Sequence, residues 1–240
     1  MVGSPSVSEA RGEEPAVPRI FVVVAAYNER QTVRAVVTRL LTCYSNEVVV
    51  DDGSIDGTSH CLAGTGVYLL RHITNRGQGA ALQTAIVFAL SRGADVIVTF
   101  DADGQHDERD IEALIHPILT GQCDVVLGSR FLGSTVDIPV TRFLLLKVAV
   151  LFSRVFSGIR ISDTHNGLRA FSRRAAESLT ITVDRMGHAS EVLDFIRRGR
   201  WRYQEVPVTI RYSGYSLARG QSSWNALTIG AQVVLKRLYR

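Results

Sequence analysis

Residues 94–106 read ADVIVTFDADGQH, and the fold is best interpreted outward from this stretch. Its first seven residues are mostly apolar, which predicts a buried β-strand. Two carboxylates, Asp101 and Asp103, follow this strand with one residue between them. At this spacing both can reach a hard divalent cation, whose other ligands come from phosphate oxygens and water. The alternative is a turn or helix cap, because Asp commonly precedes helices. The pair taken alone favours that alternative.

Apolar runs and helical patterns alternate through the first half of the chain. Further apolar runs occupy residues 19–26, 47–51, 67–72 and 124–127, and helical spacing is found at residues 29–42, 79–92 and 107–120. Near-continuous Val and Ile runs separated by helices are typical of parallel sheets that are covered on both faces. We therefore predict an α/β fold with a Rossmann-like, mostly parallel sheet flanked by helices.

A short polar segment follows each predicted strand. The five segments are residues 27–29, 51–54, 75–79, 101–103 and 128–130. In open α/β sheets, ligands bind at the edge where the parallel strands have their carboxyl ends. Five such segments together predict one binding site at that edge.

The segment VVVDDGSIDGT at residues 48–58 is more specific than the Asp pair. Gly53 permits a tight turn that brings backbone close to a ligand. Asp52 can accept a hydrogen bond from a base N–H or a ribose hydroxyl, as acidic residues do in dinucleotide-binding folds. Ser54 or Asp56 can instead cap the next helix. We expect Asp56 to be structural and Asp52 to face the ligand.

The segment NRGQG at residues 75–79 has the composition of a phosphate-binding loop. Arg76 and Gly77 lead into a predicted helix, whose N-terminal N–H groups suit an anion. No Gly-Lys-Ser/Thr sequence follows, so the loop is not a Walker A motif. The first strand is not followed by GxGxxG, which argues against a dinucleotide-binding oxidoreductase.

The order of the motifs resembles that of family 2 glycosyltransferases. They are AAYNE (25–29), VVDDGSIDGT (49–58), NRGQGAAL (75–82), FDADGQH (100–106) and GSRF (128–131). Over residues 19–212 the chain is most similar to the dolichyl- and polyprenyl-phosphate mannose and glucose synthase branch. The resemblance implies a GT-A fold and an inverting transferase. It also implies a nucleotide-diphosphate sugar as donor, with Mg²⁺ or Mn²⁺ as the metal.

The resemblance also implies roles for individual residues. Positions that match nucleotide-binding residues of the family are Ala25, Tyr27, Glu29 and Asp52. To these we add Arg76, Gly77 and Asp101. Positions that match residues serving the metal and the diphosphate are Asp101, Asp103 and Gln105. Arg130 matches a residue that faces the acceptor phosphate.

The acceptor side departs from the family pattern. Residues 163–171 read DTHNGLRAF, where many relatives have Ser-Gly-Phe-Arg. Arg169 is kept and is a reasonable second phosphate contact, with Asp163 beside it in the predicted acceptor site. A phosphate acceptor is already ionised and needs only to be positioned by Arg130 and Arg169. A hydroxyl acceptor needs a general base, for which Glu191 is the first candidate and Asp163 the second.

Composition and charge restrict the partners. The chain has 240 residues, of which 46% are hydrophobic and 21% charged, as in globular domains. Residues 1–168 contain 14 Lys and Arg against 18 Asp and Glu, whereas residues 169–240 contain 13 against 5. The basic C-terminal part favours an anionic partner such as a lipid phosphate or a membrane surface. Nucleic acid is not expected, because no helix-turn-helix or aromatic-rich RNA motif is present. Three cysteines without metal-ligand spacing predict unpaired thiols.

Three segments are predicted along the chain: a flexible N-terminal tail at 1–18, a transferase domain at 19–223 and a C-terminal amphipathic helix at 224–240. The tail is rich in Ser, Pro, Glu and Gly and has no secretory signal. A second amphipathic helix is expected at 143–159, which is too short and too charged to span a membrane. Core packing and peripheral membrane contact are the alternatives for both helices. We expect a cytoplasmic protein, with the cytoplasmic face of the membrane as the place of such contact.

The expected reaction moves a sugar from GDP-mannose or a UDP-hexose to a polyprenyl phosphate by metal-assisted in-line displacement. Asp103, Arg130 and Glu191 are the expected catalytic residues. A soluble or glycan hydroxyl acceptor is the main alternative. A sugar nucleotidyltransferase would need a Gly-rich basic loop directly after the first strand, and AAYNERQT at 25–32 has none. A non-catalytic nucleotide-binding subunit is disfavoured, because the Asp pair, the GSR sequence and the Asp52 turn are intact.

Overall fold

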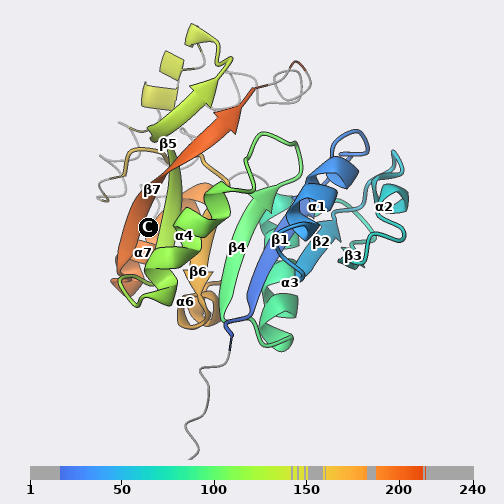
Figure 1. Ribbon diagram of the computed structural model, residues 1–240, viewed down its shortest axis with the longest axis horizontal. Coiled ribbons are helices and arrows are strands. Elements are labelled where there is room, and N and C mark those ends of the chain that lie inside the picture. Colours follow the sequence, from blue (N-terminus) through green and yellow to red (C-terminus); the bar gives the residue numbers. More distant parts are fainter. Residues whose placement is uncertain are drawn as a thin grey trace, which may run out of the picture.

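One seven-stranded sheet organises the chain (Figure 1). The structure is a computed structural model that describes residues 17–212 and 214, apart from 142, 145, 149, 151–158, 160 and 183–187. The strand order is β3-β2-β1-β4-β6-β5-β7. The strands are β1 (Ile20–Ala26), β2 (Glu47–Asp51), β3 (Tyr68–Arg71), β4 (Val96–Asp101), β5 (Val125–Val136), β6 (Arg169–Ser172) and β7 (Tyr203–Arg211).

The first four strands run parallel to one another, as the sequence predicts. β1 pairs with β2 and β4, and β2 pairs with β3, all in parallel register. All five residues of β2 are buried, which agrees with a strand covered on both faces. The predicted mostly parallel α/β sheet is confirmed.

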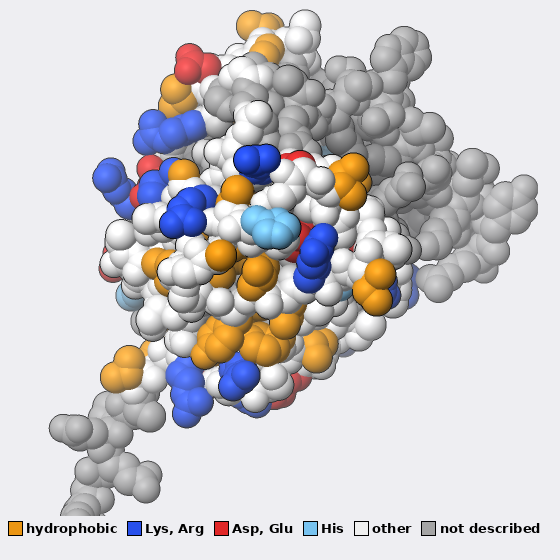
Figure 2. Space-filling view, turned by 90° about the vertical axis from the view of Figure 1, so that its right-hand side faces the viewer, with side chains coloured by type: hydrophobic (Ala, Val, Ile, Leu, Met, Phe, Trp, Pro, Cys, Tyr) orange, Lys and Arg blue, Asp and Glu red, His pale blue; other side chains and the backbone are white. Residues whose placement is uncertain are grey.

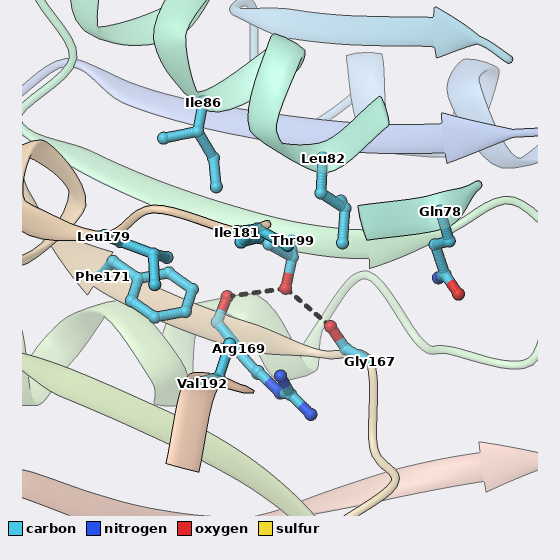
Figure 3. Close-up of a pocket in the computed structure, with 10 residues that line it drawn as sticks. All are labelled: Gln78, Leu82, Ile86, Thr99, Gly167, Arg169, Phe171, Leu179, Ile181 and Val192. Carbon is cyan, nitrogen blue, oxygen red and sulfur yellow. Dashed lines mark hydrogen bonds between the residues drawn. The ribbon is translucent and has the colours of Figure 1, made fainter. Parts of the chain in front are cut away.

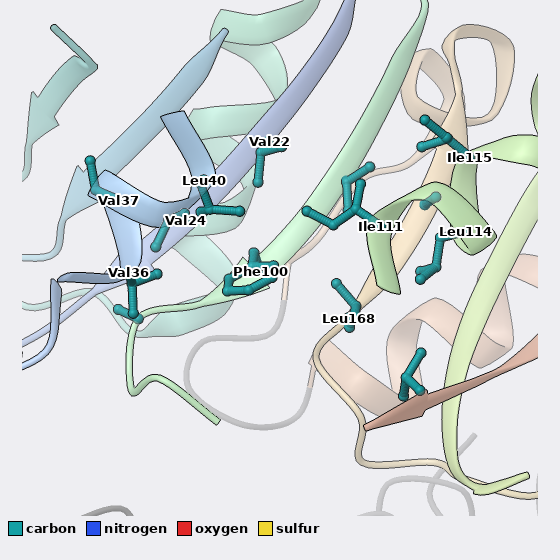
Figure 4. Close-up of a cluster of buried hydrophobic side chains, with 14 of the residues drawn as sticks. Val22, Val24, Val36, Val37, Leu40, Phe100, Ile111, Leu114, Ile115 and Leu168 are labelled. Atoms are coloured by element: carbon teal, nitrogen blue, oxygen red, sulfur yellow. The ribbon is translucent and has the colours of Figure 1, made fainter. Parts of the chain in front are cut away.

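Helices cover both faces of the sheet. They are α1 (Val33–Leu41), α2 (Thr58–Cys61), α3 (Gln78–Ser91), α4 (Asp110–Leu119), α6 (Arg173–Ser178) and α7 (His188–Gly199). α1 and α4 pack on one face, where Val22, Leu40 and Phe100 belong to the buried cluster shown in Figure 4. α3, α6 and α7 pack on the opposite face around a second buried cluster. The alternating side chains of each strand therefore supply two cores, one on each side.

The second part of the sheet differs from the prediction, because a reversed strand lies within it. β6 pairs antiparallel with both β4 and β5, and so separates two strands that point the same way. The sequence pattern did not indicate β6 or β7. β5 extends to Val136, well beyond the predicted 124–127, and its pairing with β7 is irregular between Ser129 and Ser134. A Cβ at Gly133 would collide with the backbone of Val208, so this close approach requires glycine.

Helix boundaries shift where loops are tied to one another. Helical spacing predicts a helix from residue 29, but α1 begins at Val33. The preceding turn is held by the next loop, because Asn28 has a positive φ of 55° and its N–H donates to Ser54 Oγ at 2.8 Å. α4 likewise begins at Asp110 rather than at residue 107.

β3 is the outer strand at one end of the sheet. Tyr68 and Leu69 are exposed there, and the Arg92 guanidinium lies over the Tyr68 ring at 5.4 Å. Figure 2 shows hydrophobic side chains gathered on the face at this end of the molecule. All three cysteines are unpaired, as predicted. The predicted tail at 1–18, the helix at 143–159 and the C-terminal helix at 224–240 lie largely or wholly outside the described residues.

Candidate active site

The predicted polar segments meet at one edge of the sheet. β1, β2, β3 and β4 have their carboxyl ends there, and β5 passes the same edge at residues 128–130. β6 runs the opposite way, so the loop before it arrives at the same edge. Residues 162–168 therefore join the site, although they precede a strand rather than follow one.

Asp101 is fixed by two donors. Gln78 Nε2 donates to its Oδ1 at 3.0 Å, and His106 Nε2 lies 2.9 Å from its Oδ2. Gly167 packs so closely that a Cβ there would collide with both carboxylate oxygens. The Gly167 carbonyl in turn accepts a hydrogen bond from Thr99 Oγ1 at 2.6 Å. None of these partners was predicted as a site residue, and only the structure brings them together.

Asp103 lies in an electronegative surrounding. Burial, followed by the negative charges of Asp101 and Glu29, raises the pKa of its carboxyl to about 6. The His106 side chain and the Gln105 N–H, which donates to Asp103 Oδ1 at 3.0 Å, act in the opposite direction. Like charges crowded in this way favour a bound cation.

The residues present fit a divalent cation that is shared with a phosphate ligand. In the part of the chain that the structure describes, no three His, Cys, Asp or Glu side chains form a complete metal site. Asp101 and Asp103 alone would give an incomplete oxygen shell, which suits Mg²⁺ or Mn²⁺ completed by diphosphate oxygens and water. The Gln105 N–H donates to Asp103, and the role of Gln105 at the metal and the diphosphate stays a prediction.

Asp52 is buried and organises the loop before α3. Its carboxylate accepts N–H bonds from Arg76 at 3.0 Å and Gly77 at 2.6 Å, and lies 2.6 Å from His72 Nδ1. His72 Nε2 continues the chain to Thr84 Oγ1 at 3.0 Å. The loop leads into the N-terminus of α3, as predicted for phosphate binding. The described contacts of Asp52 thus hold the loop, and its contact with a nucleotide stays a prediction.

The loops after β1 and β2 are tied together. Asn28 Oδ1 accepts from the Ile55 N–H at 3.0 Å, and the Glu29 N–H donates to Thr58 Oγ1 at 2.8 Å. Asp56 accepts from the Thr58 N–H at 2.9 Å, in the structural role that we expected.

This arrangement places the predicted nucleotide-binding residues side by side. Ala25 is the next-to-last residue of β1 and so lies near this edge of the sheet, and Tyr27 is 42% exposed. Gly53 has a φ of 74°, and a Cβ there would meet the Thr74 carbonyl carbon at 2.6 Å. Glycine is therefore required where the loops at 51–54 and 74–77 approach each other.

Arg130 is buried on the other side of Asp101. Its Nε donates to Asp163 Oδ2 at 2.6 Å, and its Nη1 donates to the Tyr212 hydroxyl at 2.6 Å. Burial lowers the pKa of its guanidinium, but the carboxylate of Asp163 and the oxygen of Tyr212 outweigh it and raise the pKa. Arg130 therefore stays charged. Tyr212 is a further site residue that the sequence did not indicate.

Arg169 links the two sides. Its Nε donates to the Asn166 carbonyl at 3.0 Å and its Nη2 to the Thr164 carbonyl at 3.2 Å. Burial lowers the pKa of its guanidinium to about 10, and the charges of Asp101 and Asp163 partly offset this. It remains a cation at neutral pH, and it lies in the electrostatic field of both carboxylates.

A small pocket lies beside these groups (Figure 3). Gln78, Thr99, Gly167 and Arg169 contribute polar atoms to it, and the other lining residues are apolar. Its apolar end reaches Val192 of α7, next to Glu191. The Glu191 carboxylate accepts from the Thr182 N–H at 3.0 Å and from its hydroxyl at 2.5 Å. Glu191 thus joins α7 to the segment before it, and its role as a base stays a prediction.

Side chains of β7 and β5 hold Asp163 and its loop in place. Glu205 of β7 accepts from the Ser162 N–H at 2.8 Å and from the Asp163 N–H at 3.3 Å. Ser162 Oγ lies 2.5 Å from Ser129 Oγ at the end of the regular part of β5. Contacts from β5 and β7 therefore fix the Arg130–Asp163 pair.

Comparison with known proteins adds to this geometry. The family model for glycosyl transferase family 2 matches residues 21–180. Over 223 residues the chain is 32% identical to the UDP-N-acetylglucosamine–dolichyl-phosphate N-acetylglucosaminyltransferase of Methanococcus voltae, covering 84% of this chain and 89% of that protein. Over 239 residues it is 32% identical to the polyprenol monophosphomannose synthase of Mycolicibacterium smegmatis, covering 91% and 89%.

A solved structure shows the same fold. Glucosyl-3-phosphoglycerate synthase of Mycobacterium tuberculosis superposes with a TM-score of 0.71 at 20% identity, covering 92% of this chain and 80% of that one. That enzyme has also been solved with Mn²⁺ and UDP-glucose. The likeness confirms the predicted GT-A architecture.

Proposed function

The chain belongs to glycosyl transferase family 2, and we propose that it moves a sugar from a nucleotide-diphosphate sugar to a polyprenyl phosphate. It is a hexosyltransferase by its family and its relatives. The acceptor is proposed because two relatives that span most of the chain are named for transfer to dolichyl phosphate and to polyprenol.

One observation carries the proposal: the carboxylate pair Asp101 and Asp103 lies near two buried guanidinium groups, those of Arg130 and Arg169. Arg169 connects them, because it interacts electrostatically with both Asp101 and Asp163. Asp101 and Asp103 can bind the cation of a departing diphosphate. Arg130 and Arg169 can bind an anion next to it, because both guanidinium groups are buried and stay charged at neutral pH. Without these positive charges, a donor diphosphate and an acceptor phosphate in neighbouring sites would repel each other.

On the donor side the residues bind and orient the leaving group. The loop held by Asp52 presents the N–H groups of the α3 N-terminus to phosphate oxygens. Asp101 and Asp103 would hold Mg²⁺ or Mn²⁺, which would supply positive charge to stabilise the departing diphosphate. Tyr27 and Glu29 belong to the segment that is tied to the loop after β2, where the nucleoside would be placed.

On the acceptor side an oxygen of the lipid phosphate attacks the anomeric carbon. The bond from that carbon to the diphosphate breaks, and its electron pair leaves with the nucleoside diphosphate. A phosphate oxygen is already ionised at neutral pH, so no proton needs to be removed. This fits Asp163, whose carboxylate is engaged by Arg130 rather than poised as a base.

The site of action is proposed to be a membrane surface, at the cytoplasmic face. Within the described ranges, no helix is long and apolar enough to cross a membrane. The basic C-terminal part of the chain is suited to an anionic membrane surface that carries a lipid phosphate acceptor.

The test is a transfer assay with a panel of donors and acceptors. The purified chain is incubated with Mg²⁺ or Mn²⁺ and with GDP-mannose, UDP-glucose or UDP-N-acetylglucosamine. Each donor is offered polyprenyl phosphate, the matching polyprenol, a free glycan or no acceptor, and products are identified by mass. We expect a glycosyl phospholipid from polyprenyl phosphate only. Transfer to the glycan or the alcohol, without transfer to the phosphate, would replace this proposal by the hydroxyl-acceptor alternative.

A further inference from the structure

We propose that His106 is a positioning residue that, together with Gln78, fixes the Asp101 carboxylate for cation binding. The inference rests on the proposed function, because it concerns the cation that Asp101 and Asp103 would hold. His106 itself contacts Asp101 and is not placed as a ligand. Its expected contribution is to metal affinity.

The geometry around Asp101 is that of a carboxylate held from both sides. His106 is 4% exposed, and its Nε2 lies 2.9 Å from Asp101 Oδ2. Gln78 Nε2 donates to the other oxygen at 3.0 Å. A carboxylate has about four acceptor sites, so two donors leave capacity for a cation while preventing rotation of the group.

The hydrogen bonds assign the proton to one nitrogen of the His106 ring. Nδ1 is buried and has no partner among the described residues. A proton on Nδ1 would be buried without an acceptor, which is costly. Nε2 faces a carboxylate oxygen, which can only accept, so an Nε2–H donates to Asp101.

The position of His106 is set by β7, from the other end of the sheet. His106 forms an isolated antiparallel bridge with Ile210, and the Arg211 N–H donates to the Gln105 carbonyl at 2.9 Å. The ring also meets Phe100 edge-on, with 5.3 Å between centroids. The backbone of this segment is tied to β7 and the ring packs on Phe100 of β4, so the ring cannot follow Asp101 if that carboxylate rotates.

Loss of such a partner weakens metal sites in general. Groups that orient a metal ligand typically contribute 10- to 100-fold in metal affinity. We expect His106→Phe to weaken Mn²⁺ binding by about that factor, because it keeps a flat ring and removes the donor. His106→Gln should restore most of the affinity, because its amide can donate at a position close to that of Nε2. Gln78→Met removes the other donor without entering the core around Phe100, and should weaken binding less.

The experiment measures Mn²⁺ binding directly. Free Mn²⁺ is followed by electron paramagnetic resonance during titration of the full chain, alone and with GDP or UDP. His116→Phe is the matched control, because His116 is exposed on α4 and distant in the fold from the site. Thermal unfolding is recorded for every variant, so that folded variants are compared.

The outcomes separate the two proposals. If the wild-type chain binds no Mn²⁺ with either nucleotide, the proposed metal site itself fails. If it binds Mn²⁺ and both His106→Phe and Gln78→Met keep wild-type affinity, the positioning role is refuted while the proposed function stands. If His106→Phe does not fold, Gln78→Met and His106→Gln still decide. Weakening by Gln78→Met with near-normal binding by His106→Gln supports the role, and unchanged binding by Gln78→Met refutes it.

Discussion

The two halves of the sheet reach the same site by different routes. In the β1–β4 half the four strands are parallel to one another, and the site residues lie at the ends of the strands or on the segments that follow them. In the β5–β7 half the site residues come from the middle of β5, from the loop before the reversed strand β6, and from the end of β7. The difference shows that one edge can be assembled from strand ends of either kind.

The two halves also differ in charge. The β1–β4 half presents the carboxylates of Asp101 and Asp103, and the β5–β7 half presents the guanidinium groups of Arg130 and Arg169. The two halves meet where Gly167 packs on Asp101 and where Arg169 interacts electrostatically with both Asp101 and Asp163. A cation site and an anion site can therefore lie side by side without cancelling each other, because each charge is anchored in its own half.

The largest expected effect on the transfer rate comes from a change in the β1–β4 half, which presents the carboxylates. Asp103→Ala should lower kcat by about a thousand-fold, because the charge on the leaving diphosphate loses its counter-ion. The melting temperature should not fall, since removal of a crowded carboxylate relieves repulsion. Steady-state transfer with saturating Mn²⁺ measures the effect, and Asp194→Ala on the exposed side of α7 is the control. Near-normal turnover of Asp103→Ala would disprove the role of the Asp pair.

The junction between the halves should respond next. Gly167→Ala puts a methyl group against both oxygens of Asp101 and should lower kcat/KM by about a hundred-fold, through displacement of that carboxylate. Gly214→Ala is the control, because its Cβ would point into open space. The loss should appear with every acceptor and in Mn²⁺ affinity as well. A loss confined to one acceptor would place Gly167 in the acceptor site instead.

A change in the β5–β7 half, which presents the guanidinium groups, should have a smaller effect that is selective for the acceptor. Arg130→Lys keeps the charge but cannot bond to both Asp163 and Tyr212, and should raise KM for the acceptor about ten-fold. The KM for the donor should change little, because the donor lies on the other half. Initial rates with each substrate varied in turn measure this split, and Tyr212→Phe should shift acceptor KM in the same direction by less. An equal rise in both KM values would contradict the division of labour between the halves.

The sequence predicted the β1–β4 half well because its structure is local. The apolar runs at 19–26, 47–51, 67–72 and 94–100 correspond to β1, β2, β3 and β4, and the glycines after the second and third runs, Gly53 and Gly77, have a positive φ. The carboxylates of this half therefore appear in the sequence beside the strands that place them. The motifs that resemble family 2 glycosyltransferases indicated the same edge.

The β5–β7 half could not be predicted in the same way because its contacts are distant along the chain. β6 has only four residues, Arg169–Ser172, and pairs with strands that lie far before it. Tyr212 reaches Arg130 across 82 positions, and Glu205 reaches Ser162 across 43. No periodicity indicates such pairs. His106 and Gln78 were missed for a related reason, since their partner Asp101 was read as a ligand and not as a group that must itself be held.

The smallest expected effect on transfer concerns a carboxyl group far from the site. Glu47 at the start of β2 is 1% exposed, and neither oxygen has a hydrogen-bond partner among the described residues. Burial raises its pKa to about 8. Asp124, at the corresponding start of β5, is paired with Arg174 and Arg202 instead.

Because the folded state holds the Glu47 proton that the unfolded chain releases, stability should fall as pH rises from about 5 to about 8, by up to about 1.4 kcal/mol per pH unit. Glu47→Gln should remove this slope, so the variant melts higher than wild type at pH 9 and equally at pH 5. Asp124→Asn should bring no such gain, since it removes the partner of two arginines. Melting curves across this range, with transfer rates unchanged at pH 7, test the contrast. If the Glu47→Gln variant keeps the wild-type pH slope, then ionisation of the Glu47 carboxyl is not what lowers the stability of the protein as pH rises.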